Sequence, residues 1–225
     1  KIAAGEVYQV NACRVLSAKN ESNPSLLPLV EKILEQNPAE FAAYLNFGDI
    51  QVASASPERF ISLKDGVAIS SPIKGTSVTD EFLEKDRAEN LMIVDLIRND
   101  LSKVAKTGSV TTPRLLATEA HPGLFHLVSD VRAELSEGKD LVDLLLAMSP
   151  PGSVSGAPKS SALKIIKENE SPRGPYCGVI GFSDGDRAEL AVGIRIFWQA
   201  EDQILRFGTG AGITWGSDSE LEWDE

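Results

Sequence analysis

The spacing of apolar residues changes along the chain, and this change constrains the fold more than any other feature of the sequence. Residues 41–70 form short apolar runs separated by turn residues such as Gly48, which is typical of antiparallel strands. Across residues 80–106 the apolar side chains recur every three to four positions, as at Ile97 and Leu101, which indicates a long helix. After that helix the pattern changes again, and the chain ends in further β-type runs.

These patterns predict the order of the elements. Strands are expected at 7–12, 41–47, 50–54, 59–63, 67–70, 125–135, 176–182, 190–199 and 203–207. Helices are expected at 26–36, 80–106, 141–148 and 159–169. The strands of 41–70 read as an antiparallel meander. Because strands and helices come in blocks, without regular alternation, the fold class is α+β with antiparallel sheets.

The charge, the apolar runs and the cysteine content exclude some kinds of partner and surroundings. The 225 residues include 33 acidic and 22 basic side chains, a net charge of -11. No cluster of Lys and Arg offers the patch that a nucleic-acid backbone requires, so we expect no nucleic-acid partner. The apolar run 141–148 is too short to cross a bilayer. Two cysteines, Cys13 and Cys177, are too few for a disulfide framework; we interpret both as ordinary buried thiols and expect a cytoplasmic protein.

Two pairs of acids have a spacing that suits a metal site. Asp86 and Glu89 lie three residues apart on the predicted helix 80–106, and Glu222 and Glu225 have the same spacing near the end of the chain. Residues three apart share one helix face, and Mg²⁺ takes carboxylate oxygens while keeping several waters. In an acidic chain the same spacing also marks a solvated helix face.

Two loops have sequences that permit ligand binding. Residues 151–160 contain Gly, Pro, Ser and Lys159, but Ala157 and Pro158 break the Walker pattern. The loop still leads into a helix, whose first backbone N–H groups are free and can bind an anion. The alternative is that the loop is only the turn at which the helix begins. The run 208–212 contains three glycines, which suits close approach to a ligand or a tight β-turn.

Three single residues are candidates with open alternatives. Lys74 lies between a proline turn and a glycine, where most lysines face solvent. His126 is flanked by apolar residues and suits a hydrogen-bonded structural role as well as catalysis. Arg195 lies inside an apolar run; if buried it needs a partner, which is either a ligand carboxylate or an internal acid.

Eight ordered segments together resemble the chorismate-binding enzymes. This family includes the large components of anthranilate synthase and aminodeoxychorismate synthase, and the isochorismate and salicylate synthases. The segments are Gly5–Asn11, Ser56–Phe60, Pro72–Thr76, Glu84–Leu101, His126–Ser129, Gly152–Lys159, Arg173–Tyr176 and Gly210–Gly212. The resemblance covers nearly the whole chain. It implies large antiparallel sheets with helices packed outside and the active site between them.

The resemblance also implies a metal site. Glu89 and Glu225 match the family's metal-ligand carboxylates, and Asp86 and Glu222 match acids that act directly or through water. The shorter side chain of Asp86 favours the water-mediated role. The implied cofactor is Mg²⁺, which would help an acidic protein to hold the dianion chorismate.

Substrate contacts are implied in the same way. His126 matches the histidine near the departing group and the ring carboxylate. Arg195 and Tyr176, with the backbone at Gly210 and Gly212, resemble the pocket for the enolpyruvyl carboxylate. Ser153 matches a Ser/Thr position near the substrate. Thr76, which closes the segment that contains Lys74, is assigned to substrate binding.

Two positions select a branch of the family. Lys74 is similar to the lysine of the aminodeoxychorismate synthases, a nucleophile that attacks C2 of the ring while Glu58 protonates the departing C4 hydroxyl. The anthranilate synthases have Ala there, and members that add water carry a lysine where this chain has Gln9. The resemblance therefore implies amino transfer to chorismate with the enolpyruvyl group retained, as in 4-aminobenzoate and folate synthesis. Ammonia would come from a glutamine amidotransferase, as a separate subunit or a fused domain.

The same resemblance bears on domain organisation. We expect residues 1–225 to form one chorismate-binding catalytic domain that lacks the N-terminal part of the family fold, and both ends look cut. The alternatives are an anthranilate synthase component, which Lys74 disfavours, and a non-catalytic chorismate-binding module. The presence of both Lys74 and Glu58 argues against such a module.

Overall fold

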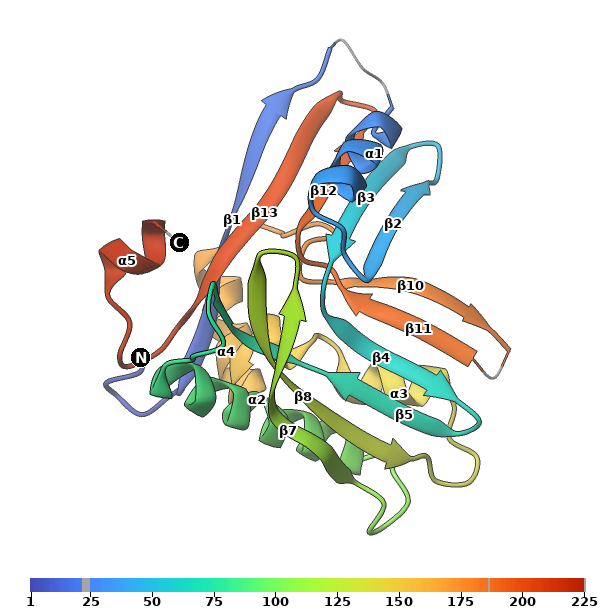
Figure 1. Cartoon of the computed structure of the whole chain (residues 1–225), viewed down its shortest axis with the longest axis vertical. Helices are drawn as coiled ribbons and strands as arrows, with labels where there is room; N and C mark the ends of the chain where they lie inside the picture. Colours follow the sequence, from blue (N-terminus) through green and yellow to red (C-terminus); the bar gives the residue numbers. More distant parts are fainter. Residues whose placement is uncertain (22–24, 186, 225) are drawn as a thin grey trace.

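The computed structural model describes residues 1–21, 25–185 and 187–224 (Figure 1). The sequence prediction for Glu225 lies outside these residues. The strands are β1 Gln9–Lys19, β2 Phe41–Asn46, β3 Ile50–Ser56, β4 Arg59–Lys64, β5 Val67–Ser71, β6 Ile73–Ser77, β7 Thr111–His121, β8 Leu124–Glu134, β9 Gly156–Ala157, β10 Val179–Asp184, β11 Arg187–Val192, β12 Ile196–Ala200 and β13 Ile204–Ile213. The helices are α1 Leu27–Gln36, α2 Glu84–Ser102, α3 Leu141–Met148, α4 Lys159–Asn169 and α5 Ser219–Asp224, with a 3₁₀ turn, η1, at Gly152–Val154.

Within the described residues the strands form two antiparallel sheets. The first has the order β2-β3-β12-β13-β1-β9, and the second has the order β10-β11-β4-β5-β8-β6, with β7 paired to β8. In Figure 1 the long pair β1 and β13 rises beside α1, while β4, β5 and β8 cross the lower half of the molecule above α2. The helices pack on the sheets: α2 contacts β8 and β6, α4 contacts β1, and α1 contacts β3. The predicted α+β class with antiparallel sheets is confirmed.

Helix α2 forms the centre of the core. Its residues Ile93, Ile97 and Leu101 are buried and lie four apart, so they share one face. At its start the carboxylate of Asp86 accepts a hydrogen bond from the backbone N–H of Leu83, at 3.0 Å, which satisfies a free donor of the first turn. The helix is shorter than the predicted 80–106, because Ser102 ends it before the turn at Gly108.

The predicted meander over residues 41–70 is wrong in its pairing. β2 pairs with β3 and β4 pairs with β5, but β3 and β4 belong to different sheets. The short segment at Pro57 and Glu58 carries the chain from one sheet to the other. The alternation of apolar and polar residues along a strand indicates which face of the strand is buried. It does not indicate which other strand is its hydrogen-bonded neighbour.

Two further predictions about strands are wrong. The run 190–199 is two strands, β11 and β12, which belong to different sheets and are separated at Gly193–Arg195. Strands β6 and β7 were not predicted, because β6 carries Lys, Gly and Thr, and β7 contains Pro113 on a sheet edge, where proline is tolerated.

None of the helices in the described part of the chain combines the length and the apolar content that crossing a bilayer requires.

Candidate active site

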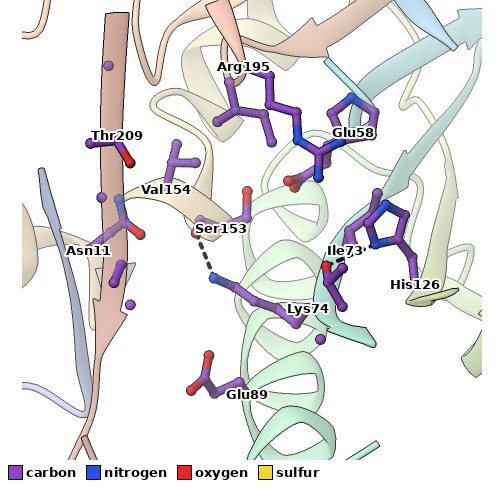
Figure 2. Close-up of a pocket in the computed structure, with 18 of the residues that line it drawn as sticks. Asn11, Glu58, Ile73, Lys74, Glu89, His126, Ser153, Val154, Arg195 and Thr209 are labelled. Atoms are coloured by element: carbon purple, nitrogen blue, oxygen red, sulfur yellow. Dashed lines mark hydrogen bonds between the residues drawn. The ribbon is translucent and has the colours of Figure 1, made fainter. Parts of the chain in front are cut away.

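A cavity of about 380 Å³ lies where both sheets meet the first turns of α2 and helix α5 (Figure 2). Its size is within the range of small-molecule sites. Every predicted site residue that the structure describes lines it: Glu58, Lys74, Thr76, Asp86, Glu89, His126, Ser153, Tyr176, Arg195, Gly210, Gly212 and Glu222. Residues as distant in the sequence as Glu58 and Glu222 therefore line one cavity.

A β-bulge directs Lys74 into the cavity. Ile73 pairs with Val128 and Thr76 pairs with His126, so three steps along β6 oppose two along β8, and one extra residue is inserted. Bulges re-aim side chains next to active sites. Gly75 has φ +91° and lies so close to Asp86 that an added Cβ would be 2.9 Å from the Asp86 Cβ. Figure 2 shows Lys74 extending into the cavity, where its Nζ donates to the Ser153 carbonyl at 3.0 Å. The alternative of a solvent-facing turn lysine is excluded.

Glu58 lies on the switch between the sheets and is buried, with 5% of its surface exposed. Burial raises the pKa of Glu58 to about 7, although a hydrogen bond from Ser153 and the positive charge of Lys74 act in the opposite direction. A carboxylic acid with such a pKa retains a proton near neutral pH and can donate it to a leaving group.

His126 is fully buried on β8 and takes part in a polar pair. Its Nδ1 lies 3.0 Å from the hydroxyl oxygen of Thr76, and its ring meets the ring of His121 edge-on at 4.6 Å. Burial, together with His121 and Arg195, lowers the pKa of His126 to about 4. The imidazole is therefore neutral at physiological pH, and it can offer a ligand one hydrogen bond without a charge.

The acids of α2 and α5 converge on one cation. Lys85 Nζ lies 2.7 Å from Glu222 Oε1 and 4.0 Å from Glu89 Oε1. Burial raises the pKa of Glu89. Burial acts in the same direction on Glu222, but hydrogen bonds from Lys85 and Ser217 lower its pKa. Two carboxylates from distant parts of the chain, on α2 and α5, thus form a position that already holds a positive charge.

The chemistry of these donors fits a hard divalent cation. Glu89 and Glu222 offer carboxylate oxygens, and the buried Oε1 of Gln9 has no hydrogen-bond partner in the described part of the molecule. Gln9 Nε2 lies 3.4 Å from Glu89 Oε2. Mg²⁺ takes oxygen ligands of this type and keeps waters on its other sides. Among residues 1–21, 25–185 and 187–224, no three His, Cys, Asp or Glu side chains lie together as a ready-made metal site, so Lys85 would have to give way.

Arg195 lies in the break between β11 and β12, not within a rigid strand. Its φ is +50°, a left-handed conformation that is uncommon for a residue other than glycine and that clusters at functional sites. The side chain is half-buried, and burial lowers the pKa of its guanidinium. No carboxylate among the described residues forms an ion pair with it, so the internal salt bridge considered from the sequence is excluded there. A half-buried cation that faces a cavity is suited to an anionic ligand.

The glycines of residues 208–212 lie inside β13, and the tight turn considered from the sequence is excluded. They allow neighbouring side chains to pack directly on the strand. A Cβ on Gly208 would be 2.1 Å from the ring of Tyr176, and one on Gly210 would be 2.7 Å from Cys13 Sγ. Tyr176 is buried against this strand, and burial raises its pKa.

Three polar or charged side chains of the cavity were not predicted as site residues: Asn11, Lys85 and Thr209. Asn11 closes the segment Gly5–Asn11, which resembles the family but carries no assigned role. Gln9 and Asn11 are both buried and lie two apart on β1, so a pair of polar residues on one strand face was the available signal. Lys85 carried no such signal, because its role depends on residues 137 positions away.

The chain is similar to known proteins in both sequence and fold. The chorismate binding enzyme family matches residues 1–225. Aminodeoxychorismate synthase component 1 of Salmonella typhimurium is 39% identical over 99% of this chain and 52% of the relative. Anthranilate synthase component 1 of Aquifex aeolicus is 38% identical over all of this chain and 48% of the relative.

A solved structure of a related protein has a fold similar to that of this chain. The crystal structure of anthranilate synthase component I from Streptococcus pneumoniae superposes with a TM-score of 0.90 and 32% identity, covering 99% of this chain and 52% of that one. The chain spans about half the length of these relatives. The family match over all 225 residues shows that the chain belongs to the chorismate-binding enzymes.

Proposed function

We propose that this chain is the catalytic part of an aminodeoxychorismate synthase component 1, which converts chorismate and ammonia to 4-amino-4-deoxychorismate. The observation that carries the proposal is the placement of Lys74, an amine aimed by a bulge into a cavity that also contains the protonated acid Glu58. An amine and a neutral acid on one cavity suit nucleophilic attack coupled to protonation of a leaving group.

In the proposed reaction Lys74 acts first. Its Nζ loses a proton to solvent and forms a bond to C2 of the ring, the ring double bonds shift, and the C4–O bond breaks. The proton of Glu58 passes to the departing hydroxyl, which leaves as water. Ammonia then forms a bond at C4, the double bonds shift back, and the C2–Nζ bond breaks to release Lys74. The enolpyruvyl group is untouched, so the product is not aromatic.

Other residues of the cavity bind and orient the substrate. Arg195 has the planar fork that pairs with a carboxylate, and we assign it to the enolpyruvyl carboxylate, beside Tyr176 and the backbone at Gly210. Neutral His126, held by Thr76, lies on the same side of the cavity as Arg195 in Figure 2. Glu89 and Glu222 would hold Mg²⁺, which when bound supplies positive charge for the second carboxylate of chorismate. A glutaminase would supply the ammonia.

Product analysis tests the proposal. The full-length protein is incubated with chorismate, Mg²⁺ and ammonium, and the product is identified by mass; 4-amino-4-deoxychorismate is expected. Lys74→Ala should slow its formation strongly, while Lys64→Ala, at the exposed end of β4, should leave the rate unchanged. In the absence of ammonia, the peptide that contains Lys74 should carry chorismate less one water.

The same experiment separates the alternatives. Anthranilate as the product would identify an anthranilate synthase component, which the comparisons support at the same level of identity. Chorismate binding without any product would identify a non-catalytic module. If no adduct forms and Lys74→Ala keeps the wild-type rate, the nucleophile assignment is wrong.

A further inference from the structure

The chain's two cysteines, 164 positions apart, meet behind one wall of the cavity. Cys13 lies on β1, Cys177 lies just before β10, and their sulfur atoms are 3.9 Å apart. The interpretation of both as ordinary buried thiols overlooked this, because no local pattern links two distant cysteines. A disulfide bond is about 2.05 Å long, so the sulfurs would have to approach by about 2 Å, which rotation of a side chain between staggered positions can supply.

The groups around the sulfurs make the two thiols unequal. Asn11 Nδ2 donates to Cys13 Sγ at 3.0 Å. A hydrogen bond from the Cys177 thiol lowers the pKa of Cys13 against burial, and the charge of Arg173 acts in the same direction. The same hydrogen bond and burial raise the pKa of Cys177. Cys13 is therefore the nucleophilic thiol, and Cys177 keeps its proton until a partner is within reach.

The two sulfurs also differ in access. Cys13 is partly exposed and lines a second cavity of about 240 Å³, together with Arg14, Ile213 and Trp223. Cys177 is buried, with 7% of its surface exposed. A small oxidant can thus reach Cys13, while Cys177 is placed to react only with what forms on Cys13.

The pair lies directly behind the candidate active site. Thr209, Gly210 and Ala211 line both cavities. Tyr176, which lines the active cavity, is next to Cys177 in the chain, and both thiols act on its hydroxyl. Asn11 also lines the active cavity. Any bond between the sulfurs would alter the partners of two side chains that face the substrate space.

We propose that Cys13 and Cys177 are a reversible oxidation site that closes to an intramolecular disulfide on reaction with a small disulfide such as oxidised glutathione. The Cys13 thiolate attacks one glutathione sulfur, breaks its S–S bond and releases one glutathione thiolate. The Cys177 thiol then gives up its proton, attacks Cys13 Sγ and displaces the second glutathione. Two protein thiols are oxidised, and one glutathione disulfide is reduced to two thiols.

The closed form should bind chorismate less well. The disulfide ties β1 to the turn that carries Tyr176, and its sulfurs no longer offer Tyr176 the hydrogen bonds of two thiols. This consequence rests on the proposed function, whereas formation of the disulfide does not.

Peptide mapping of the full-length protein tests the site. After treatment with oxidised glutathione and trypsin under non-reducing conditions, peptides 2–14 and 174–187 should appear joined, with the loss of two hydrogens, and should separate on reduction. The Kd for chorismate should rise about fivefold on oxidation and return with dithiothreitol. Cys13→Ala, at a partly exposed position, should show neither change.

The outcomes are distinct. Glutathione that stays on Cys13 without joining the two peptides overturns the oxidation site, and a joined pair with unchanged chorismate affinity overturns its effect on substrate binding. If the reduced protein does not bind chorismate at all while the peptides still join, the proposed function fails and the oxidation site stands. The Cys177→Ser variant adds a second measurement, in which Cys13 should retain a stable mixed disulfide.

Discussion

Burial raises the pKa of Glu58 and lowers the pKa of Arg195, two ionisable side chains of the cavity, but only Glu58 changes its charge as a result. It raises the pKa of Glu58 to about 7, so that a substantial share of these side chains keeps its proton at neutral pH, because the charged form of a carboxylate loses its hydration inside the protein. It leaves Arg195 charged, because a guanidinium cannot be deprotonated under these conditions even when its pKa falls. The cavity therefore presents a neutral acid and a permanent cation, a combination suited to an anionic substrate with a hydroxyl leaving group.

The guanidinium of Arg195 should act through its shape as well as its charge. Arg195→Lys keeps the charge but loses the two-pronged hydrogen bond to a carboxylate, so we expect the Michaelis constant for chorismate to rise about tenfold, equivalent to about 1.4 kcal/mol. Steady-state kinetics measure this. Arg187→Lys, at an exposed position of β11, is the matched control and should leave the constant unchanged. Equal constants for the two variants would contradict the assignment.

Residue identities were predictable where chemistry restricts the choice. The residue type in a family motif determines which chemical role it can have, so a lysine, an acid and a histidine could be identified from the sequence. Lys74, Glu58 and His126 do line one cavity. What could not be predicted was the environment that tunes them. The raised pKa of Glu58 comes from its burial at the switch between two sheets, and Lys85 meets Glu222 through the tertiary fold alone.

At the scale of elements, the helices α3 and α4 have the predicted bounds, and α1 begins one residue later than predicted, because their apolar periodicity and flanking prolines act locally. Strand partners are set by the whole fold. The apolar run 190–199 looks like one strand, yet left-handed backbone at Arg195 divides it between two sheets. Because only tertiary structure holds a non-glycine residue there, the break is invisible to a reading of hydrophobic pattern.

Tyr176 can pack on β13 only because Gly208 has no side chain. Gly208→Ala would place a Cβ about 2 Å from the Tyr176 ring, and such overpacking costs about 1–3 kcal/mol of unfolding free energy. Gly216→Ala is the matched control, since a Cβ there meets nothing within 4 Å; it should change stability by less than about 1 kcal/mol. Urea unfolding measures both. A Gly208→Ala protein as stable as Gly216→Ala would show that Tyr176 is free to move off the strand.

At the scale of the whole molecule, the site depends on the C-terminal part of the chain meeting a helix from its middle, α2. Helix α5, close to the chain's C-terminal end, brings Glu222 to α2, and in Figure 1 both termini lie on the side of the molecule where α5 and the start of α2 are found. The family resemblance could suggest that these acids act together. It could not show that Lys85 bridges them.

Removal of either bridging carboxylate should weaken the response to metal. Glu222→Gln and Glu89→Gln should each raise the Mg²⁺ concentration needed for half-maximal chorismate turnover by about tenfold or more, and calorimetry should show the same loss in Mg²⁺ binding without substrate. The exposed acids Glu220 on α5 and Glu84 on α2 provide matched Glu→Gln controls. Normal turnover in EDTA would contradict the metal assignment.

The stability of the whole fold should carry the signature of buried Glu58. Its pKa is about 7 in the folded protein and about 4.5 when the carboxyl is free in water. The folded state therefore holds the proton more tightly than the unfolded state, and folding stability falls as the pH rises from 4.5 through 7. At 1.36 kcal/mol for each pKa unit, the loss between pH 5 and pH 8 is about 2–3 kcal/mol. Glu58→Gln removes this titration, so its unfolding free energy relative to wild type should rise by that amount over the same range. Urea unfolding at several pH values measures the difference, and Glu201→Gln, at an exposed position, should show no such trend. If the wild-type and Glu58→Gln curves run parallel from pH 5 to pH 8, Glu58 does not hold a proton in the folded protein, and it cannot serve as the acid for the departing hydroxyl.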